Sequence, residues 1–304
     1  MIMKPALSRF LFTLLPSLLI ALLYLRPCLA NELFADIHIH YNWDQAEIIS
    51  ATEVINRLRQ ANVGLTIVSS TPTPLALELR RAGGNWVLPF FSPYTHELGK
   101  RDWFRDASVV SKAEQGLAQG LYYGIGEVHF MAGRLPRADN PVFLQLMALA
   151  EHFHVPVMIH VDAANEQFFA KICTAHPQVN ILFAHAGGIL KPAHIESILQ
   201  QCPNVWVEFS ARDPWRYGGI SDEQQRLLPA WRELVLRYPQ RFLTGTDPVW
   251  RVTRTQSWDE PDDGWDHYGE LVQFHQHWLA DLPPTVRRKV AWENALRLFP
   301  AFQP

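Results

Sequence analysis

Eight short apolar runs alternate with helix-like segments from residue 33 onward, and this alternation constrains the fold more than any other feature. The intervening segments, such as 51–63, 141–154 and 221–239, space their apolar residues three and four apart, as amphipathic helices do. Alternating strands and helices predict a parallel sheet, and eight such units in a 304-residue chain predict a closed (β/α)8 TIM barrel rather than an open doubly wound sheet. The expected strands are 33–40, 64–70, 86–93, 122–130, 155–160, 179–185, 204–210 and 241–247.

The first 30 residues have the pattern of a cleavable signal peptide. Lys4 and Arg9 precede the apolar stretch 11–25, and Cys28 and Ala30 stand at positions −3 and −1 of a small-x-small cleavage site. The apolar stretch is short for a membrane span, although an uncleaved anchor is the alternative. We therefore expect an exported, periplasmic protein with a signal peptide over 1–30 and one barrel domain over 31–304.

Charge and cysteine content limit the partners of this domain. Removing residues 1–30 takes away three basic residues and no acidic ones, which changes the formal net charge from −3 to −6. This predicts a small-molecule substrate, no nucleic acid and no stable membrane insertion after cleavage, and it leaves open whether the chain forms a homodimer. Cys173 and Cys202, near the expected bottom of the barrel, either form one disulfide or remain two buried thiols.

Ionisable residues stand at the ends of five expected strands, and the carboxyl ends of barrel strands meet at one rim. So many ionisable groups in apolar strands require pairing or a bound metal, and imidazoles and carboxylates are ligands of catalytic Zn²⁺. We expect a divalent metal, Zn²⁺ first, although Mn²⁺, Ni²⁺ or Fe²⁺ suits the same ligands. Taken singly, the histidines could be ordinary half-buried residues and Asp247 a helix N-cap. The set is His38, His40, Glu127, His160, His185 and Asp247.

The sequence resembles the amidohydrolase superfamily, and within it the amidohydrolase-related branch. The resemblance rests on the HxH pair, on "GE" at Glu127 and on the stretches "PVMIH", "FAHAGG", "FLTGTDP" and "ENALRLF", and it covers nearly all of the chain after residue 30. It implies a TIM barrel with one or two metal ions. One ion would be held by His38, His40 and Asp247 and the second by His160 and His185. Glu127 would bridge them, as in phosphotriesterase-like and TatD-like relatives.

The resemblance also implies a reaction. A bound divalent ion lowers the pKa of its water to about 7 and polarises a substrate oxygen. Asp247 would take the proton of that water, and His185 would be the acid/base group if only one ion binds. We expect a hydrolase that cleaves a C–O or C–N bond in a small carboxylate-bearing ester, lactone or amide. The alternatives are a mononuclear decarboxylase, a TatD-like phosphoesterase and a binding protein that has lost its chemistry.

Two long segments follow the last two strands and supply candidate substrate contacts. They are 211–220 and 248–267, and both are rich in arginine and aromatic residues. Such side chains suit a substrate with a ring and a carboxylate, but they also serve solubility and packing. We expect Arg212 and Trp250, together with Trp43 after the HxH pair, to bind substrate. Glu208 and Ser210 share one face of the seventh strand.

Overall fold

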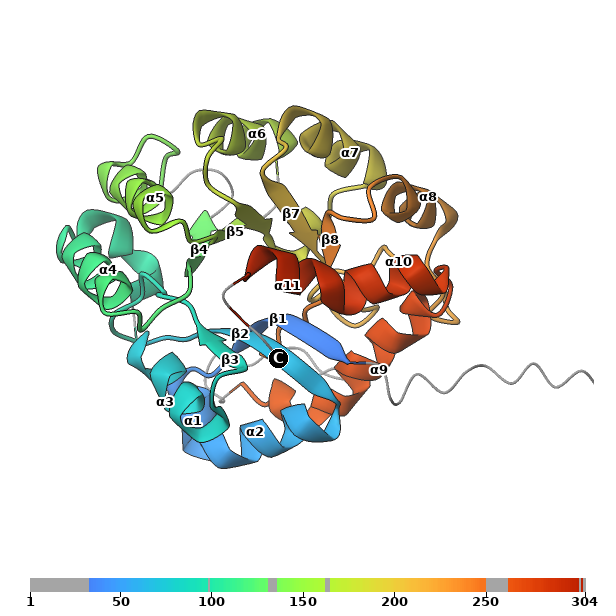
Figure 1. Cartoon of the computed structure of the whole chain (residues 1–304), viewed down its shortest axis with the longest axis horizontal. Coiled ribbons are helices and arrows are strands. Elements are labelled where there is room, and N and C mark those ends of the chain that lie inside the picture. The colour runs from blue at the N-terminus through green and yellow to red at the C-terminus, as the bar shows by residue number, and fades with distance from the viewer. Residues whose placement is uncertain are drawn as a thin grey trace, which may run out of the picture.

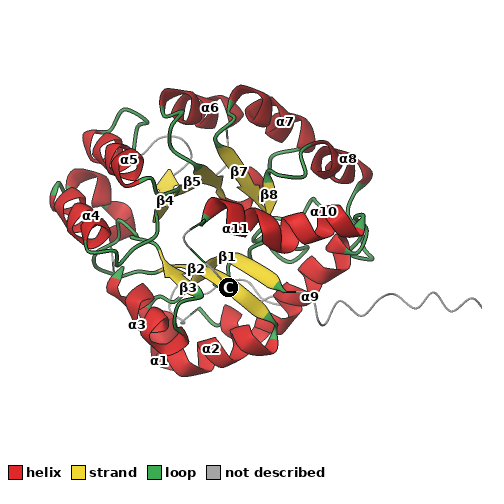
Figure 2. Cartoon of the chain, in the orientation of Figure 1, coloured by secondary structure: helices red, strands yellow, loops and turns green. Residues whose placement is uncertain are grey.

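Eight parallel strands surround a common axis, and helices cover the outside of the ring (Figures 1 and 2). The computed structural model describes residues 33–97, 99–130, 136–161, 165–249, 262–300 and 302. Each strand overlaps the range expected from the sequence. The strands are β1 (Phe34–His40), β2 (Val63–Ser69), β3 (Val87–Pro89), β4 (Ile125–Phe130), β5 (Val157–Val161), β6 (Ile181–Phe183), β7 (Val205–Glu208) and β8 (Phe242–Leu243).

The strands form two parallel arcs, β1 to β3 and β4 to β8, each in sequence order. Phe91 pairs with Ile125 and joins the arcs between β3 and β4. On the other side, the amide of Ile37 donates to the carbonyl of Thr244 at 3.1 Å, and the amide of Asp247 donates to the carbonyl of His38 at 2.7 Å. These contacts link β8 back to β1. The order around the ring is therefore that of a (β/α)8 barrel.

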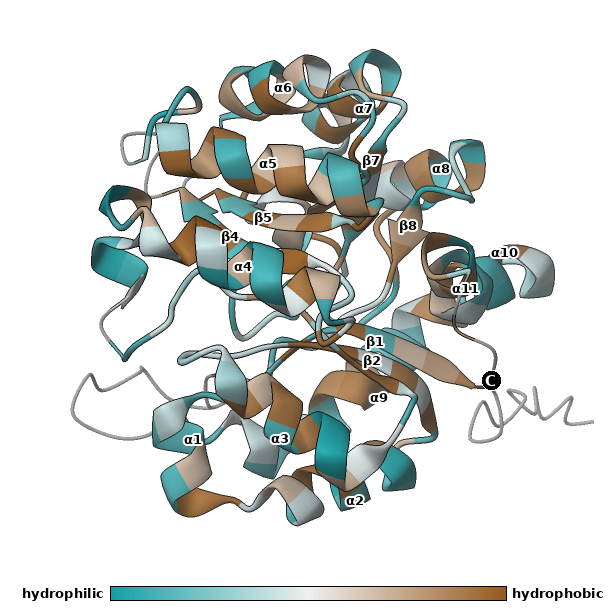
Figure 3. Cartoon of the chain, turned by 60° about the vertical axis from the view of Figure 1, so that its left-hand side comes forward, coloured by the Kyte–Doolittle hydropathy of each residue, from teal (hydrophilic) through white to brown (hydrophobic). Residues whose placement is uncertain are grey.

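The helices lie outside the strands, with apolar residues toward the sheet (Figure 3). The 3-10 segment η4 (Ala184–Gly187) follows β6, and η5 (Gly264–His267) precedes α9. The helices are α1 (Trp43–Ile48), α2 (Ala51–Gln60), α3 (Pro74–Gly83), α4 (Ser108–Ala118), α5 (Pro141–Phe153), α6 (Glu166–Ala175), α7 (Pro192–Gln201), α8 (Pro229–Arg237), α9 (Tyr268–Leu279), α10 (Pro284–Arg288) and α11 (Asn294–Leu298). In the part of the chain described, none is long and apolar enough to cross a membrane.

The apolar core has an outer and an inner part. The outer part fills the layer between strands and helices. The inner part holds Ile37, Ile67 and Leu182 from the strands, with Leu298 of α11 and Phe299 beside them. In Figure 1, α11 crosses the near end of the barrel. That end is therefore closed by apolar side chains, which leaves the carboxyl ends of the strands as the end for chemistry.

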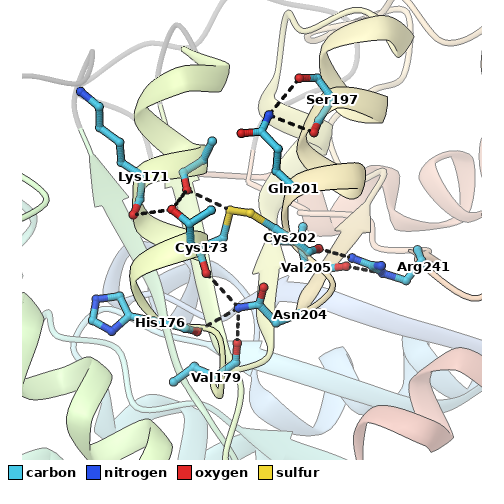
Figure 4. Close-up of a disulfide and its surroundings, with 12 residues drawn as sticks. Lys171, Cys173, His176, Val179, Ser197, Gln201, Cys202, Asn204, Val205 and Arg241 are labelled. Atoms are coloured by element: carbon cyan, nitrogen blue, oxygen red, sulfur yellow. Dashed lines mark hydrogen bonds between the residues drawn. A yellow bond between two sulfur atoms is a disulfide. The ribbon is translucent and has the colours of Figure 1, made fainter.

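Cys173 of α6 and Cys202, the residue after α7, form a disulfide at the amino-terminal end of the strands (Figure 4). The Asn204 side chain donates to the carbonyls of Cys173, His176 and Val179. Of the two states that the sequence left open for these cysteines, the structure has the bonded one.

Candidate metal centre

Six ionisable residues converge at the carboxyl ends of the strands, and as whole residues none is more than 7% exposed. They come from both arcs of the barrel. They are His38 and His40 of β1, Glu127 of β4, His160 of β5, His185 of η4 and Asp247 after β8. The structure therefore brings together all six residues that the sequence suggested as ligands.

An irregularity in β1 helps to orient the two histidines of the HxH pair. The register of β1 against β2 shifts between Asp36 and Ile39. Consistent with this shift, Ile37 packs in the inner core and Ile39 in the outer core, although strict alternation would place both on one face. His38 and His40 nevertheless point to the same place, and their Nε2 atoms lie 3.1 Å apart.

The first group of candidate ligands is His38, His40 and Asp247. Asp247 Oδ1 lies 3.3 Å from Nε2 of His40 and 4.0 Å from Nε2 of His38. Two ligands of one tetrahedral Zn²⁺ at 2.0–2.1 Å would be separated by about 3.3 Å. The spacing of the three atoms therefore suits ligands of a single ion.

The second group is Glu127, His160 and His185. Glu127 Oε1 lies 2.9 Å from Nδ1 of His160 and 3.3 Å from Nε2 of His185, and the two nitrogens are 3.0 Å apart. The other oxygen, Oε2, lies 3.6 Å from Nε2 of His38 and 3.5 Å from Nε2 of His40. One carboxylate thus faces both groups, as a bridging ligand must.

Hydrogen bonds fix the proton positions on the HxH imidazoles and test whether a cation fits. His38 Nδ1 lies 2.9 Å from a carboxylate oxygen of Glu208, and His40 Nδ1 lies 2.8 Å from the carbonyl oxygen of Ser69. Both partners accept only, so each Nδ1 carries the proton. In the neutral imidazoles both Nε2 atoms are then bare and present lone pairs to each other at 3.1 Å. A cation bound by both Nε2 atoms would remove the repulsion between their lone pairs.

The pKa shifts of the surrounding groups also favour a positive charge at this site. Burial alone would lower the pKa of His38, but the carboxylates of Glu127 and Glu208 raise it well above its usual value. Burial would raise the pKa of Glu127, yet the imidazoles of His129, His38 and His160 bring it well below its usual value. The carboxylates therefore stay ionised and hold positive charge at the rim, whether carried by protons or by a metal.

Asp247 is anchored from the side that faces away from the histidines. The residue has φ of 52°, in the left-handed region, and its backbone carbonyl accepts from the Arg216 guanidinium. Arg216 also donates to the carbonyl of Thr246 at 2.7 Å and pairs with Asp213 at 2.6 Å. Its Nη1 lies 3.7 Å from Oδ2 of Asp247, which favours the ionised carboxylate.

The structure treats the three expected substrate-binding residues differently. Arg212 is 2% exposed, stacks over Trp231 and donates to the carbonyls of Gly188 and Leu190. Its guanidinium holds the turn after η4, and its expected contact with substrate stays a prediction. Trp43 is 41% exposed and begins α1, immediately beyond the HxH strand, so its role stays a prediction. Trp250 lies outside the described residues.

Several residues that border the site were not among the predicted ligands. Glu208 and Ser210 lie behind His38 and His185, and the signal for them in the sequence was only their shared face on the seventh strand. The Tyr217 ring lies 5.5 Å from that of His185. His129 stacks on His160 at 4.4 Å, and the Tyr94 hydroxyl bonds both its backbone amide and its Nδ1.

The comparisons with known proteins agree with this geometry. A family model described as Amidohydrolase matches residues 99–301. The chain belongs to the amidohydrolase family. It is accordingly an enzyme of a generally metal-dependent class. The family match begins after β3, so the HxH pair of β1 lies outside it and is placed by the structure alone. A search of curated proteins finds no match.

Solved structures share the fold at low sequence identity. A TatD homologue from Escherichia coli K12 is 14% identical with a TM-score of 0.58, over 87% of this chain and 97% of that one. A 4-oxalomesaconate hydratase from Rhodopseudomonas palustris is 12% identical with a TM-score of 0.55, over 88% and 95%. A 2,6-dihydroxybenzoate decarboxylase is 15% identical with a TM-score of 0.53, over 88% and 99%. At these identities the solved structures share the fold alone, and they assign no reaction to this chain.

Proposed function

We propose that this amidohydrolase is a metal-dependent hydrolase with two ions, and that it cleaves a C–O or C–N bond in a small carboxylate-bearing ester, lactone or amide. The observation that carries the proposal is the position of Glu127, whose two oxygens face the two ligand groups. A carboxylate in that place suits a bridged two-ion site and has no evident use in a site with one ion.

The residues of the chain have distinct roles in this proposal. His38, His40 and Asp247 would hold one ion, His160 and His185 the other, and Glu127 both. When bound, the ions supply a water that ionises near neutral pH and a positive charge on the substrate oxygen. Asp247, whose carboxylate lies beside both imidazoles of the HxH pair, takes the proton of the attacking water. It then returns the proton to the leaving oxygen or nitrogen.

The proposal is tested by metal content and hydrolysis together. The protein is purified without a metal-chelating tag, analysed for bound metals, and assayed on lactones, esters and amides with and without a carboxylate. We expect about two ions per chain, fewer in the Glu127→Gln variant, and faster hydrolysis of the carboxylate-bearing members. One ion per chain, unchanged in the variant, would contradict the proposal and favour a decarboxylase.

We also propose that the protein is exported. The Cys173–Cys202 disulfide supports this, because structural disulfides persist in oxidising compartments and are rare in the cytosol. N-terminal sequencing of the protein from fractionated cells tests the proposal. We expect a mature chain that starts at Asn31 in the periplasmic fraction, and a cytosolic chain that starts at residue 1 would contradict it.

A further inference from the structure

We propose that Glu208 is a positioning residue that holds one ligand of each metal group, so that the affinity for both ions depends on this one carboxylate. The inference rests on the two-ion centre of the proposed function and adds a residue outside the ligand set. Glu208 ends β7 and is fully buried. A buried carboxylate is costly unless its oxygens are bonded, and its partners therefore indicate its use.

The bonds of Glu208 reach both ligand groups. Its Oε1 lies 2.9 Å from Nδ1 of His38, a ligand of the first group. The same oxygen accepts from the backbone amide of His185, a ligand of the second group, at 2.8 Å. His185 has φ of 56°, an uncommon conformation for a non-glycine residue, and this bond helps to hold it.

The Ser210 hydroxyl links Glu208 to the His185 ring by two hydrogen bonds. The ring nitrogen Nδ1 of His185 lies 2.7 Å from the Ser210 hydroxyl oxygen, and that hydroxyl donates to Oε1 of Glu208 at 2.8 Å. The backbone amide of Ser210 donates to Oε2 at 2.5 Å. Nδ1 of His185 is thereby the protonated nitrogen, and Nε2 is bare and faces Glu127 and His160.

The backbone leaves room for this arrangement at Gly245. A Cβ at this position would lie 2.9 Å from Cβ of His38 and 3.0 Å from Oε2 of Glu208. By contrast, His40 is held from behind by the Ser69 carbonyl. Glu208 therefore acts through His38 and His185 in particular.

A carboxylate behind a ligating imidazole orients the ring and makes it a stronger donor, and its loss typically weakens metal binding by about 10- to 100-fold. Glu208→Gln keeps the size of the side chain and removes the charge. It also places an amide NH₂ beside either the Ser210 amide or the three donors at Oε1, so one donor faces another donor. We expect the variant to lose about 10- to 100-fold in zinc affinity at each site.

The experiment measures zinc affinity at one site at a time. Asp247→Asn leaves the second site to be titrated, and His160→Asn leaves the first. Glu208→Gln is added to each background, and zinc is titrated in competition with a chromophoric chelator. Ser210→Ala is the matched control, because it removes the short link to the His185 ring and only a longer, 3.2 Å contact to Nδ1 of His38, and it leaves the direct Glu208–His38 bond at 2.9 Å. We expect it to weaken the second site more than the first.

The outcomes separate this inference from the proposed function. Weaker zinc binding in both backgrounds supports it, and loss at one site only, or at neither, overturns it. If the parent protein binds none of Zn²⁺, Mn²⁺, Ni²⁺ and Fe²⁺, the proposed function itself fails. If circular dichroism shows that Glu208→Gln does not fold, Ser210→Ala decides, because unchanged zinc affinity at the second site would refute the link through Ser210.

Discussion

The disulfide between α6 and α7 stabilises the barrel far from the metal centre, and its contribution can be worked out from its place in the chain. Cys173 and Cys202 are 29 residues apart, and both are buried. Closing a loop of that length in the unfolded chain removes entropy worth about 3.6 kcal/mol at 25 °C. We therefore expect the Cys173→Ala/Cys202→Ala variant to lose about 3 to 4 kcal/mol of unfolding free energy.

Hydrogen bonds around the disulfide should keep the folded structure unchanged when the sulfur atoms are removed. Asn204 still ties the end of α6 to β7, and Arg241 donates to the carbonyls of Cys202 and Val205 at 2.7 and 2.6 Å (Figure 4). These bonds do not need the sulfur atoms, so the folded state should change little and the effect should arise mainly in the unfolded state.

Equilibrium urea unfolding in the presence of a chelator measures the difference in free energy. Reduced wild-type protein should match the variant, and the variant should not respond to reductant. Zinc affinity should be unchanged, since the disulfide lies at the opposite end of the strands. A loss below about 1 kcal/mol would refute the loop-entropy argument. A loss of zinc binding would contradict the expectation that the disulfide, at one end of the strands, does not affect the metal centre at the other end.

Three further predictions concern buried groups. Burial lowers the pKa of His275 to about 4, so between pH 6.5 and 4 the unfolded chain binds a proton that the folded protein does not. As the pH falls through that range, urea unfolding should show the wild type losing up to about 3 kcal/mol relative to His275→Gln, and parallel curves would contradict this. Arg212→Met should lower stability by about 1 to 3 kcal/mol, because the carbonyls of Gly188 and Leu190 lose their donor, whereas a raised KM at unchanged stability would show that Arg212 serves substrate binding alone. Tyr94→Phe should remove the hydrogen bond to Nδ1 of His129 and alter the ¹⁵N shifts of that imidazole, and unaltered shifts would contradict the Tyr94 contact.

The sequence predicts the strands well because their burial leaves continuous apolar runs between helical patterns. It predicts their ends less well. The run 179–185 yields only Ile181–Phe183, because His185 and Ala186 take left-handed conformations and turn the chain. The run 241–247 yields only Phe242–Leu243. Beyond it, Thr244 and Thr246 bond to β1 partly through their side chains, which no periodicity reveals.

The candidate ligands were predictable for a related reason. Each lies on a recognisable strand or just after one, and the barrel brings the carboxyl ends of these strands together whatever the details of register. The contacts of Arg212 were not predictable, because its sequence context of arginines and aromatics does not reveal its bonds to the carbonyls of Gly188 and Leu190, which come from another part of the chain.

The two carboxylates of β4 and β7 show where prediction from sequence ends. Alternation gives the face on which a side chain lies, and it says nothing about how far that side chain reaches. Glu127 reaches from β4 across the interior to both histidines of β1. Glu208 reaches from β7 to His38, 170 residues away in the chain. Because each carboxylate also contacts the second group, the two groups share their supports. A change at either carboxylate should therefore lower the affinity for both ions, while a change at Asp247 or His160 should lower mainly the affinity for one.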